Sequence, residues 1–398
     1  MNDADDTYHV DWNGEEWDDV ILHQTDIARV GRAGDWVMYV PGRLLVDARA
    51  AQDERVSALL GDADVSPAKG VAARDVAAQL GLTVLNAPDD RLIALVRDIG
   101  AVAAGAASLD YVMTAGSQRW GGDDEPLPIE DPGTIPGSDM ALGAGVRVAV
   151  LDTGIAKEVP FDVEYGQGDL EIPDSEPDGR RDKPAGHGTH VAGAIARIAP
   201  GSTIVVRRVL KGPGGVASSS AVAAALLAAG DADLINCSFS GPSLYDAAPV
   251  AIERALAQLP PSTVVVACAG NRATDRPQWP AACKRVIAVG AVGRDSESED
   301  WKRTDFSGYG PWVDCGAPGV RVPSTFLHHG DTCGKDPVSF DGFASWSGTS
   351  MSCPQVVGAI AALASQEGIE GVSQAAYRLV HDPAATPRVD KLGPVVAP

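Results

Sequence analysis

The chain has 398 residues, enough for one large domain and a smaller one, and it carries 32 Lys and Arg against 54 Asp and Glu, a formal net charge of −22. Such an acidic excess repels nucleic acid and anionic membranes, which excludes both as expected partners. Hydrophobic residues make up 45% of the chain and charged residues 22%, as in soluble globular proteins.

The N-terminal stretch MNDADDTYHVDWNGEEWDD is acidic and has no apolar core, so it does not resemble a secretory signal. No run of about 18 or more apolar residues predicts a spanning helix. We therefore expect a cytoplasmic protein, with export by a route that uses no such signal as the alternative. The six cysteines form no C-x-x-C pair, which disfavours a zinc site. We expect free thiols, since Cys237, Cys268 and Cys353 lie in apolar or motif-like segments.

The chain before residue 145 divides into three parts by composition. Residues 1–34 are acidic and weakly periodic, and we expect an extension there. Residues 35–114 predict a small α+β unit. In it WVMYVPGRLLVDA is strand-like around a Pro-Gly turn, AQDERVSALLGD and VAARDVAAQLG have helical spacing, and LTVLN, RLIALVRD and SLDYVMT are expected to be short strands. Residues 115–144 are rich in Gly, Pro and Asp without periodicity, which is typical of a linker.

Residues 145–398 alternate between strand-like and helical stretches. VRVAVLD and STVVVACAGN are continuous apolar runs, as in strands buried on both faces, whereas HVAGAIARIA and SSSAVAAALLAAG have helical spacing. The alternation predicts an α/β fold, a mostly parallel sheet with helices on both faces, preceded by the small α+β unit. Ligand sites in such sheets lie beyond the carboxyl ends of the strands, so the residues there are the candidates for function.

Two polar motifs follow the first strand of this part. Asp152 comes directly after an apolar strand, where a carboxylate without partners is costly, although a turn or helix cap would also explain it. His187 and His190 bracket Gly-Thr at the start of an Ala-rich helix. Their spacing leaves a metal hydrolase open, but no Glu partner or further His/Cys cluster accompanies them. A polar helix start without consequence is the other alternative.

Two further polar residues stand at element ends. Asn271 ends an apolar strand and offers two donors and one acceptor, although an Asn turn alone would explain it. Ser350 begins an apolar helix, where backbone N–H groups lack partners, and a capping role is the simpler alternative. Together, an acid, a histidine, an amide and a helix-start serine at one crevice supply the groups that acyl transfer needs.

The segments VAVLDTG, GHGTHVAG, VVVACAGN and WSGTSMSCP closely resemble, in this order, the four signature segments of the subtilisin-like serine proteases, the subtilases. The resemblance covers the α/β part and implies a serine endopeptidase. By resemblance Asp152 orients the imidazole, His187 is the general base and then the general acid, and Ser350 is the nucleophile. The Asn271 amide and the Ser350 N–H would form the oxyanion hole, and His190 would be structural.

The resemblance also implies a substrate cleft. NCSFSGP resembles the family segment that pairs with the substrate backbone, and KGPGGV matches the opposite edge strand. Ser240 stands where the family usually has Gly, and Gln278 where Gly is frequent, so we expect a tighter, shallower and more polar primary pocket. The residues expected in the cleft are Ser238, Phe239, Ser240, Gly241, Gly214, Gly215 and Gln278.

Three residues beside the nucleophile, Ser352, Cys353 and Gln355, depart from the family pattern, and we expect them to adjust details rather than the reaction. The acidic loop DLEIPDSEPDGRRDKPAG is expected to be a solvated surface loop, with a preference for basic residues near the scissile bond as the alternative. We expect no cofactor. Subtilases often bind structural calcium, but no loop here has convincing ligand spacing.

Many subtilases carry an α+β prodomain that assists folding and blocks the cleft, and residues 35–114 match it in size, element order and place. We expect an intramolecular inhibitor that is released by self-cleavage within SQRWGGDDEPLP, with a permanent accessory domain as the alternative. The expected partner is a peptide or protein substrate, turned over broadly or trimmed as one precursor such as a leader peptide. A catalytically silent binding module is the alternative to an enzyme.

Overall fold

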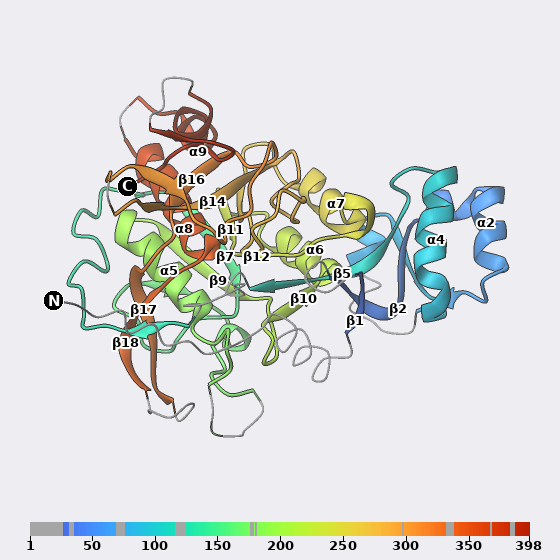
Figure 1. The fold of residues 1–398 in the computed structure, drawn as a ribbon, viewed down its shortest axis with the longest axis horizontal. Helices are drawn as coiled ribbons and strands as arrows, with labels where there is room; N and C mark the ends of the chain where they lie inside the picture. Colours follow the sequence, from blue (N-terminus) through green and yellow to red (C-terminus); the bar gives the residue numbers. More distant parts are fainter. Residues whose placement is uncertain are drawn as a thin grey trace.

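The computed structural model describes residues 27–31, 36–68, 76–115, 125–175, 179, 181–296, 298–331, 338–366, 368–382 and 387–398. Its larger lobe is built on an eight-stranded sheet that is parallel except where β15 joins its edge (Figure 1). The α/β prediction is therefore confirmed. In spatial order the strands are β15 (Trp301–Arg303), β14 (Val286–Arg294), β13 (Val264–Cys268), β11 (Leu234–Cys237), β7 (Arg147–Asp152), β9 (Thr203–Arg208) and β8 (Val163–Glu164), with β16 (Cys315–Pro318) paired to β14.

Helices cover both faces of this sheet because both faces of its strands are apolar. Val148 and Val150 of β7 lie in one buried cluster with residues of α5 and α8, whereas Ala149 and Leu151 lie in another with residues of α6 and α7. Two apolar faces explain the continuous apolar runs in the sequence. The helices are α5 (His187–Ile198), α6 (Ser219–Ala228), α7 (Val250–Gln258), α8 (Thr349–Ala364) and α9 (Gly371–Ala376).

The N-terminal unit forms a smaller lobe, at the right of Figure 1. Its strands pair antiparallel, and the first of them lies inside the segment expected to be an extension. In the expected helix VAARDVAAQLG the described residues 76–79 are helical. The elements are β1 (Ala28–Val30), β2 (Val37–Asp47), α2 (Glu54–Gly61), β3 (Ser66–Pro67), β4 (Leu82–Asn86), α4 (Asp89–Val102) and β5 (Ala107–Ala115).

Two predictions for this unit are wrong. The segment RLIALVRD is part of helix α4, not a strand, because Leu92, Leu95 and Ile99 recur at helical spacing and are buried on one face. The Pro-Gly pair in WVMYVPGRLLVDA makes no turn between two strands. Instead β2 continues through it, and Gly42 at φ +69° accompanies an irregularity in the pairing with β5.

Strand β5 joins the two lobes. Its first part pairs with β2, and its last residues pair antiparallel with one strand of the larger lobe on each side. One buried apolar cluster continues from Leu44 and Leu109 of the small lobe to Leu226 and Leu256 of the large one. The two lobes therefore share the antiparallel sheet and one apolar core. The strands that flank β5 are β10 (Val216–Ser218) and β12 (Phe239–Ser240).

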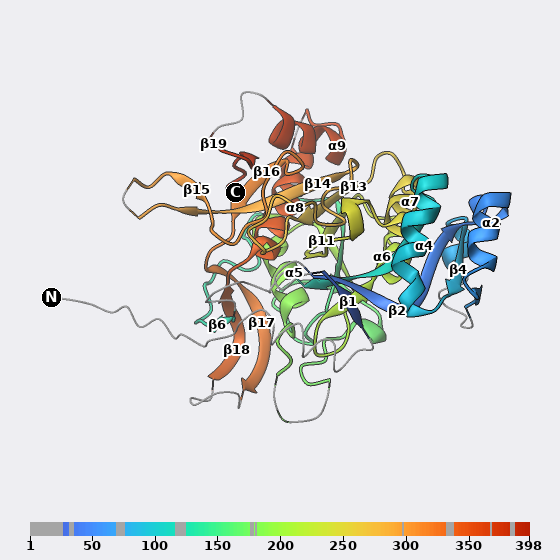
Figure 2. The ribbon, with the colours of Figure 1, turned by 45° about the vertical axis from the view of Figure 1, so that its right-hand side comes forward.

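A long hairpin of β17 and β18, absent from the sequence prediction, leads into the segment before α8, and Figure 2 shows its strands side by side. In the described part of the chain no helix combines the length and apolar character that crossing a bilayer requires. The remaining elements are β6 (Leu127–Pro128), β17 (Val322–Asp331), β18 (Val338–Trp346), β19 (Arg388–Val389), β20 (Gly393–Pro394), η1 (Ala50–Gln52), η2 (Gln167–Asp169), η3 (Leu244–Asp246) and η4 (Tyr377–His381).

Candidate active site

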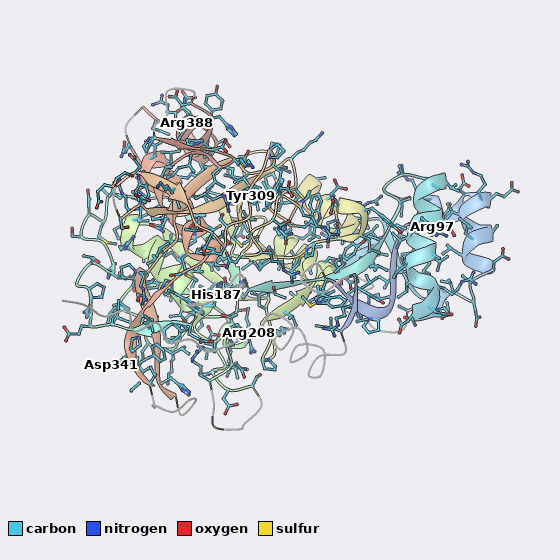
Figure 3. The ribbon with its side chains drawn as sticks, in the orientation of Figure 1. Arg97, His187, Arg208, Tyr309, Asp341 and Arg388 are labelled. Carbon is cyan, nitrogen blue, oxygen red and sulfur yellow. The ribbon has the colours of Figure 1, made fainter. Side chains whose placement is uncertain are left out.

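The candidate catalytic residues lie where strands of the parallel sheet end and helices begin. Asp152 is the last residue of β7, His187 the first of α5 and Ser350 the second of α8. All three side chains are fully buried. Figure 3 places His187 at the middle of the molecule, near the tip of β5 in that view. The fold thus brings together residues that are separated by up to about half of the chain.

Asp152 and His187 form a buried pair. The Asp152 Oδ1 atom lies 2.7 Å from His187 Nδ1 and also accepts the Thr153 N–H at 2.7 Å. Because an ionised carboxylate accepts, Nδ1 carries the proton and Nε2 is left as the basic nitrogen. A Cβ at Gly188 would lie 2.3 Å from the Gly154 oxygen, so only glycine lets the first turn of α5 approach Asp152 this closely.

The Ser350 hydroxyl points toward the segment before β12 and not toward His187. It donates to the Ser238 carbonyl at 2.9 Å and lies 3.8 Å from Cys268 Sγ. Among the described residues, His187 Nε2 has no hydrogen-bond partner. The bond between nucleophile and base therefore requires the Ser350 side chain to rotate about Cα–Cβ.

The amide of Asn271 is oriented by the residue before the serine. The Thr349 N–H and hydroxyl both donate to Asn271 Oδ1, at 2.9 and 2.8 Å. Since the oxygen is held on the Thr349 side, the Nδ2 donor faces the other way. The Ser350 N–H belongs to the first turn of α8, where backbone donors have no partner within the helix. The site thus contains two donors of the kind that stabilise a developing negative charge, Asn271 Nδ2 and the Ser350 N–H.

The second histidine is structural by its contacts. His190 Nε2 lies 3.0 Å from the Val322 carbonyl, and burial, aided by the nearby His187, lowers the pKa of His190 to about 3. It is therefore neutral at pH 7. Within the residues that the structure describes, no three His, Cys, Asp or Glu side chains are grouped so that they would hold a metal ion.

The residues that depart from the family pattern fasten α8 to the sheet. Ser352 and Gln355 donate to backbone carbonyls at the end of β16, with Ser352 Oγ 2.9 Å from its acceptor. The Cys353 thiol lies 3.2 Å from Asn236 Oδ1 on β11. These contacts hold the helix that carries the nucleophile, so they act on its position.

The expected cleft residues flank strand β5. Phe239 pairs with Ala115, and the Ala115 N–H donates to the Gly215 carbonyl at 3.1 Å. A Cβ at Gly241 would lie 2.6 Å from the Val112 carbonyl oxygen and 2.9 Å from the Met113 sulfur, so the glycine lets this segment approach β5 closely. Of the other expected cleft residues, Gly214 lies in the turn before β10 and Ser238 lies just before β12.

The side chains of Ser240 and Gln278 both lie next to Gly270. A Cβ added to Gly270 would lie 2.8 Å from Ser240 Oγ and 3.4 Å from Gln278 Cγ. Gln278 is 2% exposed, and its Nε2 donates to two backbone carbonyls at 3.3 Å. The two side chains therefore fill space that glycines would leave open.

Sequence reasoning missed Trp346, the residue at the end of β18. Its ring is 1% exposed and stands edge-on to the His187 ring, with centroids 5.4 Å apart. The sequence feature that could have indicated Trp346 is the aromatic residue that begins the segment WSGTSMSCP. Trp346 limits the positions that the imidazole can take.

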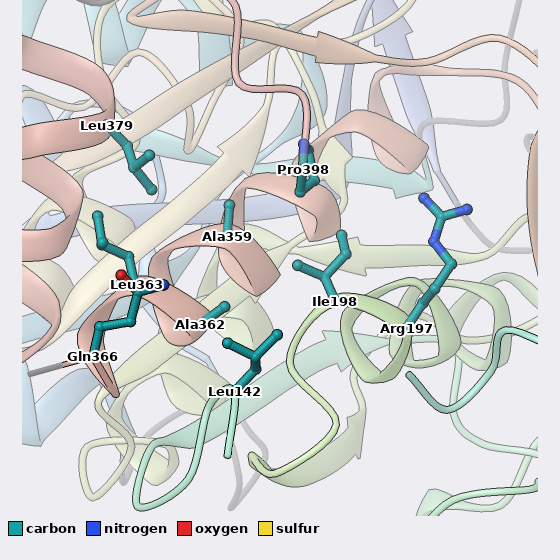
Figure 4. Close-up of a pocket in the computed structure, with 9 residues that line it drawn as sticks. All are labelled: Leu142, Arg197, Ile198, Ala359, Ala362, Leu363, Gln366, Leu379 and Pro398. Carbon is teal, nitrogen blue, oxygen red and sulfur yellow. The ribbon is translucent and has the colours of Figure 1, made fainter. Parts of the chain in front are cut away.

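The described cysteines are unbonded and buried, and Cys333 lies outside the described residues. Burial raises the pKa of Cys268, the thiol beside Ser350, to about 11, so it stays protonated at neutral pH. Away from these groups, a cavity of about 670 Å³ lies between α5 and α8 (Figure 4). Its described lining contains none of the candidate catalytic residues and consists of Leu142, Arg197, Ile198, Ala359, Ala362, Leu363, Gln366, Leu379 and Pro398.

Comparison with known proteins identifies the family to which this chain belongs. Residues 143–391 match the family model described as the Subtilase family. Subtilisin Savinase of Lederbergia lenta is 35% identical over 236 residues, which cover 56% of this chain and 78% of that protein. Subtilisin DY of Bacillus licheniformis is 34% identical over 252 residues, which cover 60% of this chain and 83% of that protein. The chain belongs to the subtilase family and is a subtilisin-like serine protease.

Two solved structures share the fold. The crystal structure of fervidolysin from Fervidobacterium pennivorans, a keratinolytic enzyme related to subtilisin, has a TM-score of 0.57 at 20% identity and covers 93% of this chain and 61% of its own. The crystal structure of a lanthipeptide protease has a TM-score of 0.50 at 24% identity. The match covers 63% of this chain and 85% of that protein's chain. The fervidolysin match is too long for the large lobe alone, so it includes residues of the N-terminal unit.

Proposed function

We propose that the protein hydrolyses peptide bonds through Asp152, His187 and Ser350, by way of an acyl-enzyme. The 2.7 Å contact of Asp152 with His187 carries this proposal because it leaves Nε2 of the imidazole unprotonated and correctly turned. When a substrate is bound, the Ser350 hydroxyl turns from Ser238 to His187. The imidazole takes the hydroxyl proton as Oγ attacks the carbonyl carbon.

The negative charge on the carbonyl oxygen is received by Asn271 Nδ2 and the Ser350 N–H. Loss of one such donor lowers turnover on the order of 10²–10³-fold in enzymes of this kind. His187 then gives its proton to the leaving amine, and the acyl-enzyme forms. A water molecule, activated by the same imidazole, hydrolyses the ester and restores Ser350.

We further propose that the N-terminal unit is an inhibitor of its own cleft. Strand β5 lies between β10 and β12 as a third strand, the position that an extended substrate would take by strand addition. The chain leaves this position at Ala115 and enters residues 116–124, which lie outside the described part. The cleavage segment predicted from the sequence, SQRWGGDDEPLP, begins just beyond this point, and we expect the scissile bond within residues 115–128.

A buried carboxylate anchors the inhibitor beside the cleft. Asp110 of β5 is fully buried and accepts hydrogen bonds of 2.7–2.8 Å from Ser219 and Ser220 at the start of α6. Arg43 of β2 pairs with the same carboxylate at 3.0 Å. A negative charge at a helix start is favourable, and the serine donors satisfy it.

The filled space at Gly270 supports a preference for small residues before the scissile bond. Ser240 and Gln278 occupy the volume that a large side chain would need. The last residue of β5 and the two that follow it are Ala-Gly-Ser, which fits such a pocket. This selectivity favours the trimming of particular precursors over broad turnover.

The test is the intact mass of the purified protein and of its Ser350→Ala variant. We expect the wild type to separate into an N-terminal piece that ends at residues 115–128 and a remainder, while the variant stays whole. Two whole chains would contradict self-processing. If the wild type, after nicking with trypsin, also hydrolyses no peptide with alanine or glycine before the scissile bond, the peptidase proposal itself fails and the silent binding module is favoured.

A further inference from the structure

A second acidic side chain lies behind Asp152. Glu171 Oε2 accepts the Thr153 hydroxyl at 3.2 Å, and Thr153 is the residue whose N–H donates to Asp152. The oxygen of the same hydroxyl accepts the Gly188 N–H at 2.9 Å. One threonine therefore links Glu171 to Asp152 and to the first turn of the helix that begins at His187.

The backbone fixes Glu171 in this position. Its N–H donates to the Ile155 carbonyl at 2.9 Å, and the Ile155 N–H donates to the Asp169 carbonyl at 3.0 Å. A Cβ at Gly154 would lie 2.7 Å from that Asp169 oxygen, so this approach requires the glycine, whose φ is +123°. The segment expected to be a solvated loop thus begins, at Glu171, as part of the catalytic framework.

Burial and the negative charge of Asp152 raise the pKa of Glu171 to about 8, against the opposing effects of the Gly186 N–H, the Thr153 hydroxyl and Arg208. Asp169 on the same loop is itself held by Arg207 and by the Arg208 N–H. The carboxyl is therefore neutral at pH 7 and ionises in the weakly alkaline range. The titratable and charged groups around it are Asp152 on β7, Arg207 and Arg208 on β9, His187 on α5 and Asp169 on η2, with His187 and Arg208 labelled in Figure 3.

We propose that Glu171 is a positioning residue of the catalytic site, which orients Thr153 against Asp152 and, when ionised, adds a second negative charge behind the imidazole of His187. This inference rests on the proposed function. The added charge favours the imidazolium that forms when His187 takes the Ser350 proton. The charge of Glu171 would act on the imidazolium over several ångströms in a partly solvated site. We therefore expect it to raise the rate about three- to tenfold.

The test is the pH dependence of kcat/KM for a peptide substrate and of the rate at which a fluorophosphonate labels Ser350, both measured after release of the N-terminal unit. We compare the wild type with Glu171→Gln, which keeps an oxygen for Thr153. The matched control is Glu164→Gln, which removes an exposed carboxylate paired with Arg147. Arg147 begins the strand that Asp152 ends, about 16 Å away along β7.

The wild type should show, above the ionisation of the catalytic base, a second rise of about three- to tenfold centred near pH 8. Glu171→Gln should lose this second rise, and Glu164→Gln should keep it. If the Glu171→Gln profile equals that of the wild type multiplied by a constant, the role of Glu171 is structural. A wild-type profile without the second rise overturns the inference whether or not the variants fold. A wild type that neither labels nor hydrolyses peptide would instead sink the proposed function.

Discussion

The two largest sheets of the molecule differ in which segments cover them and pair with their strands. The parallel sheet is covered on both faces by helices of its own lobe, and its strand ends hold the Asp152–His187 pair. The antiparallel sheet of the N-terminal unit ends in β5, whose last residues pair with strands of the other lobe. The catalytic groups are therefore positioned by a self-contained framework, whereas the N-terminal unit depends on the peptidase for part of its pairing.

The polar contacts between the lobes show the same dependence. Arg254 of α7 pairs with Asp47 of the N-terminal unit and donates to the Leu80 and Gly81 carbonyls at 3.0 Å. These contacts join two lobes that share one apolar cluster. The comparison predicts that changes at the catalytic groups abolish activity without unfolding, and that changes at the lobe contacts release the N-terminal unit without harming the site.

The largest expected effect is that of Ser350→Ala. Removal of the nucleophile should lower kcat on the order of 10⁶-fold, as the loss of the serine does in subtilisin. Far-ultraviolet circular dichroism should be unchanged, because the side chain contributes little to the core. The matched control is Ser352→Ala, two residues away, which removes a hydroxyl bonded to the Ala317 carbonyl and should keep activity within about tenfold. Loss of activity in the control variant alone would place the nucleophile elsewhere.

A change at Asp110 should separate the lobes. In Asp110→Ala the hydroxyls of Ser219 and Ser220 lose their buried acceptor and Arg43 its partner, which costs about 3–5 kcal/mol. The dissociation constant of the cleaved N-terminal unit from the peptidase should rise by about 10²–10⁴-fold. This dissociation constant is obtained by measuring how strongly the cleaved N-terminal unit still inhibits peptide hydrolysis.

The matched control for Asp110 is Asp98→Ala. Asp98 pairs with Arg97 on the exposed side of α4, so this variant should change the dissociation constant by less than about fivefold. Equal effects of the two variants would show that the buried anchor does not hold the unit in the cleft.

Widening the pocket at Gly270 should change selectivity rather than rate. Ser240→Gly combined with Gln278→Gly removes the two side chains that fill the space, so kcat/KM for phenylalanine relative to alanine before the scissile bond should rise about 10–200-fold. A series of peptides that differ in this one residue measures the ratio. An unchanged ratio would mean that these residues lie outside the pocket.

The smallest expected effect is on stability as a function of pH. The Glu171 pKa is raised from 4.5 to about 8 in the folded protein, so between these values the unfolded chain has released a proton that the folded chain retains. The free energy of unfolding therefore falls as pH rises through this window, and Glu171→Gln avoids the loss. In a Ser350→Ala background, the Tm gain of the glutamine variant should grow by a few degrees from pH 4 to pH 8. A gain that is constant with pH would contradict the raised pKa.

The parallel lobe was predictable because its signals are local. Asp152, His187, Asn271 and Ser350 each stand at the junction of an apolar run and a polar turn, and the parallel order of the strands brings these junctions to one edge. The assignment of roles to them remains a prediction that the variants above test.

The features that the sequence left undetermined depend on contacts between distant segments. The short run RLIALVRD is apolar enough for either a strand or a helix, and its packing against the antiparallel sheet decides for a helix. The contact of Glu171 with Thr153 follows from backbone bonds at Ile155, which no local pattern indicates. The hairpin β17–β18 was missed although the stretch Phe340 to Ala344 alternates between buried and more exposed residues, as in a strand.

The central claim is that Ser350 is a nucleophile activated by His187. It is tested most directly by fluorophosphonate labelling of the processed protein, followed by mass spectrometry of its peptides. The account predicts one modified residue, Ser350 in SWSGTSMSCP, and no modification in His187→Ala. Modification of another serine, or no modification in a protein that has lost its N-terminal unit, would contradict it.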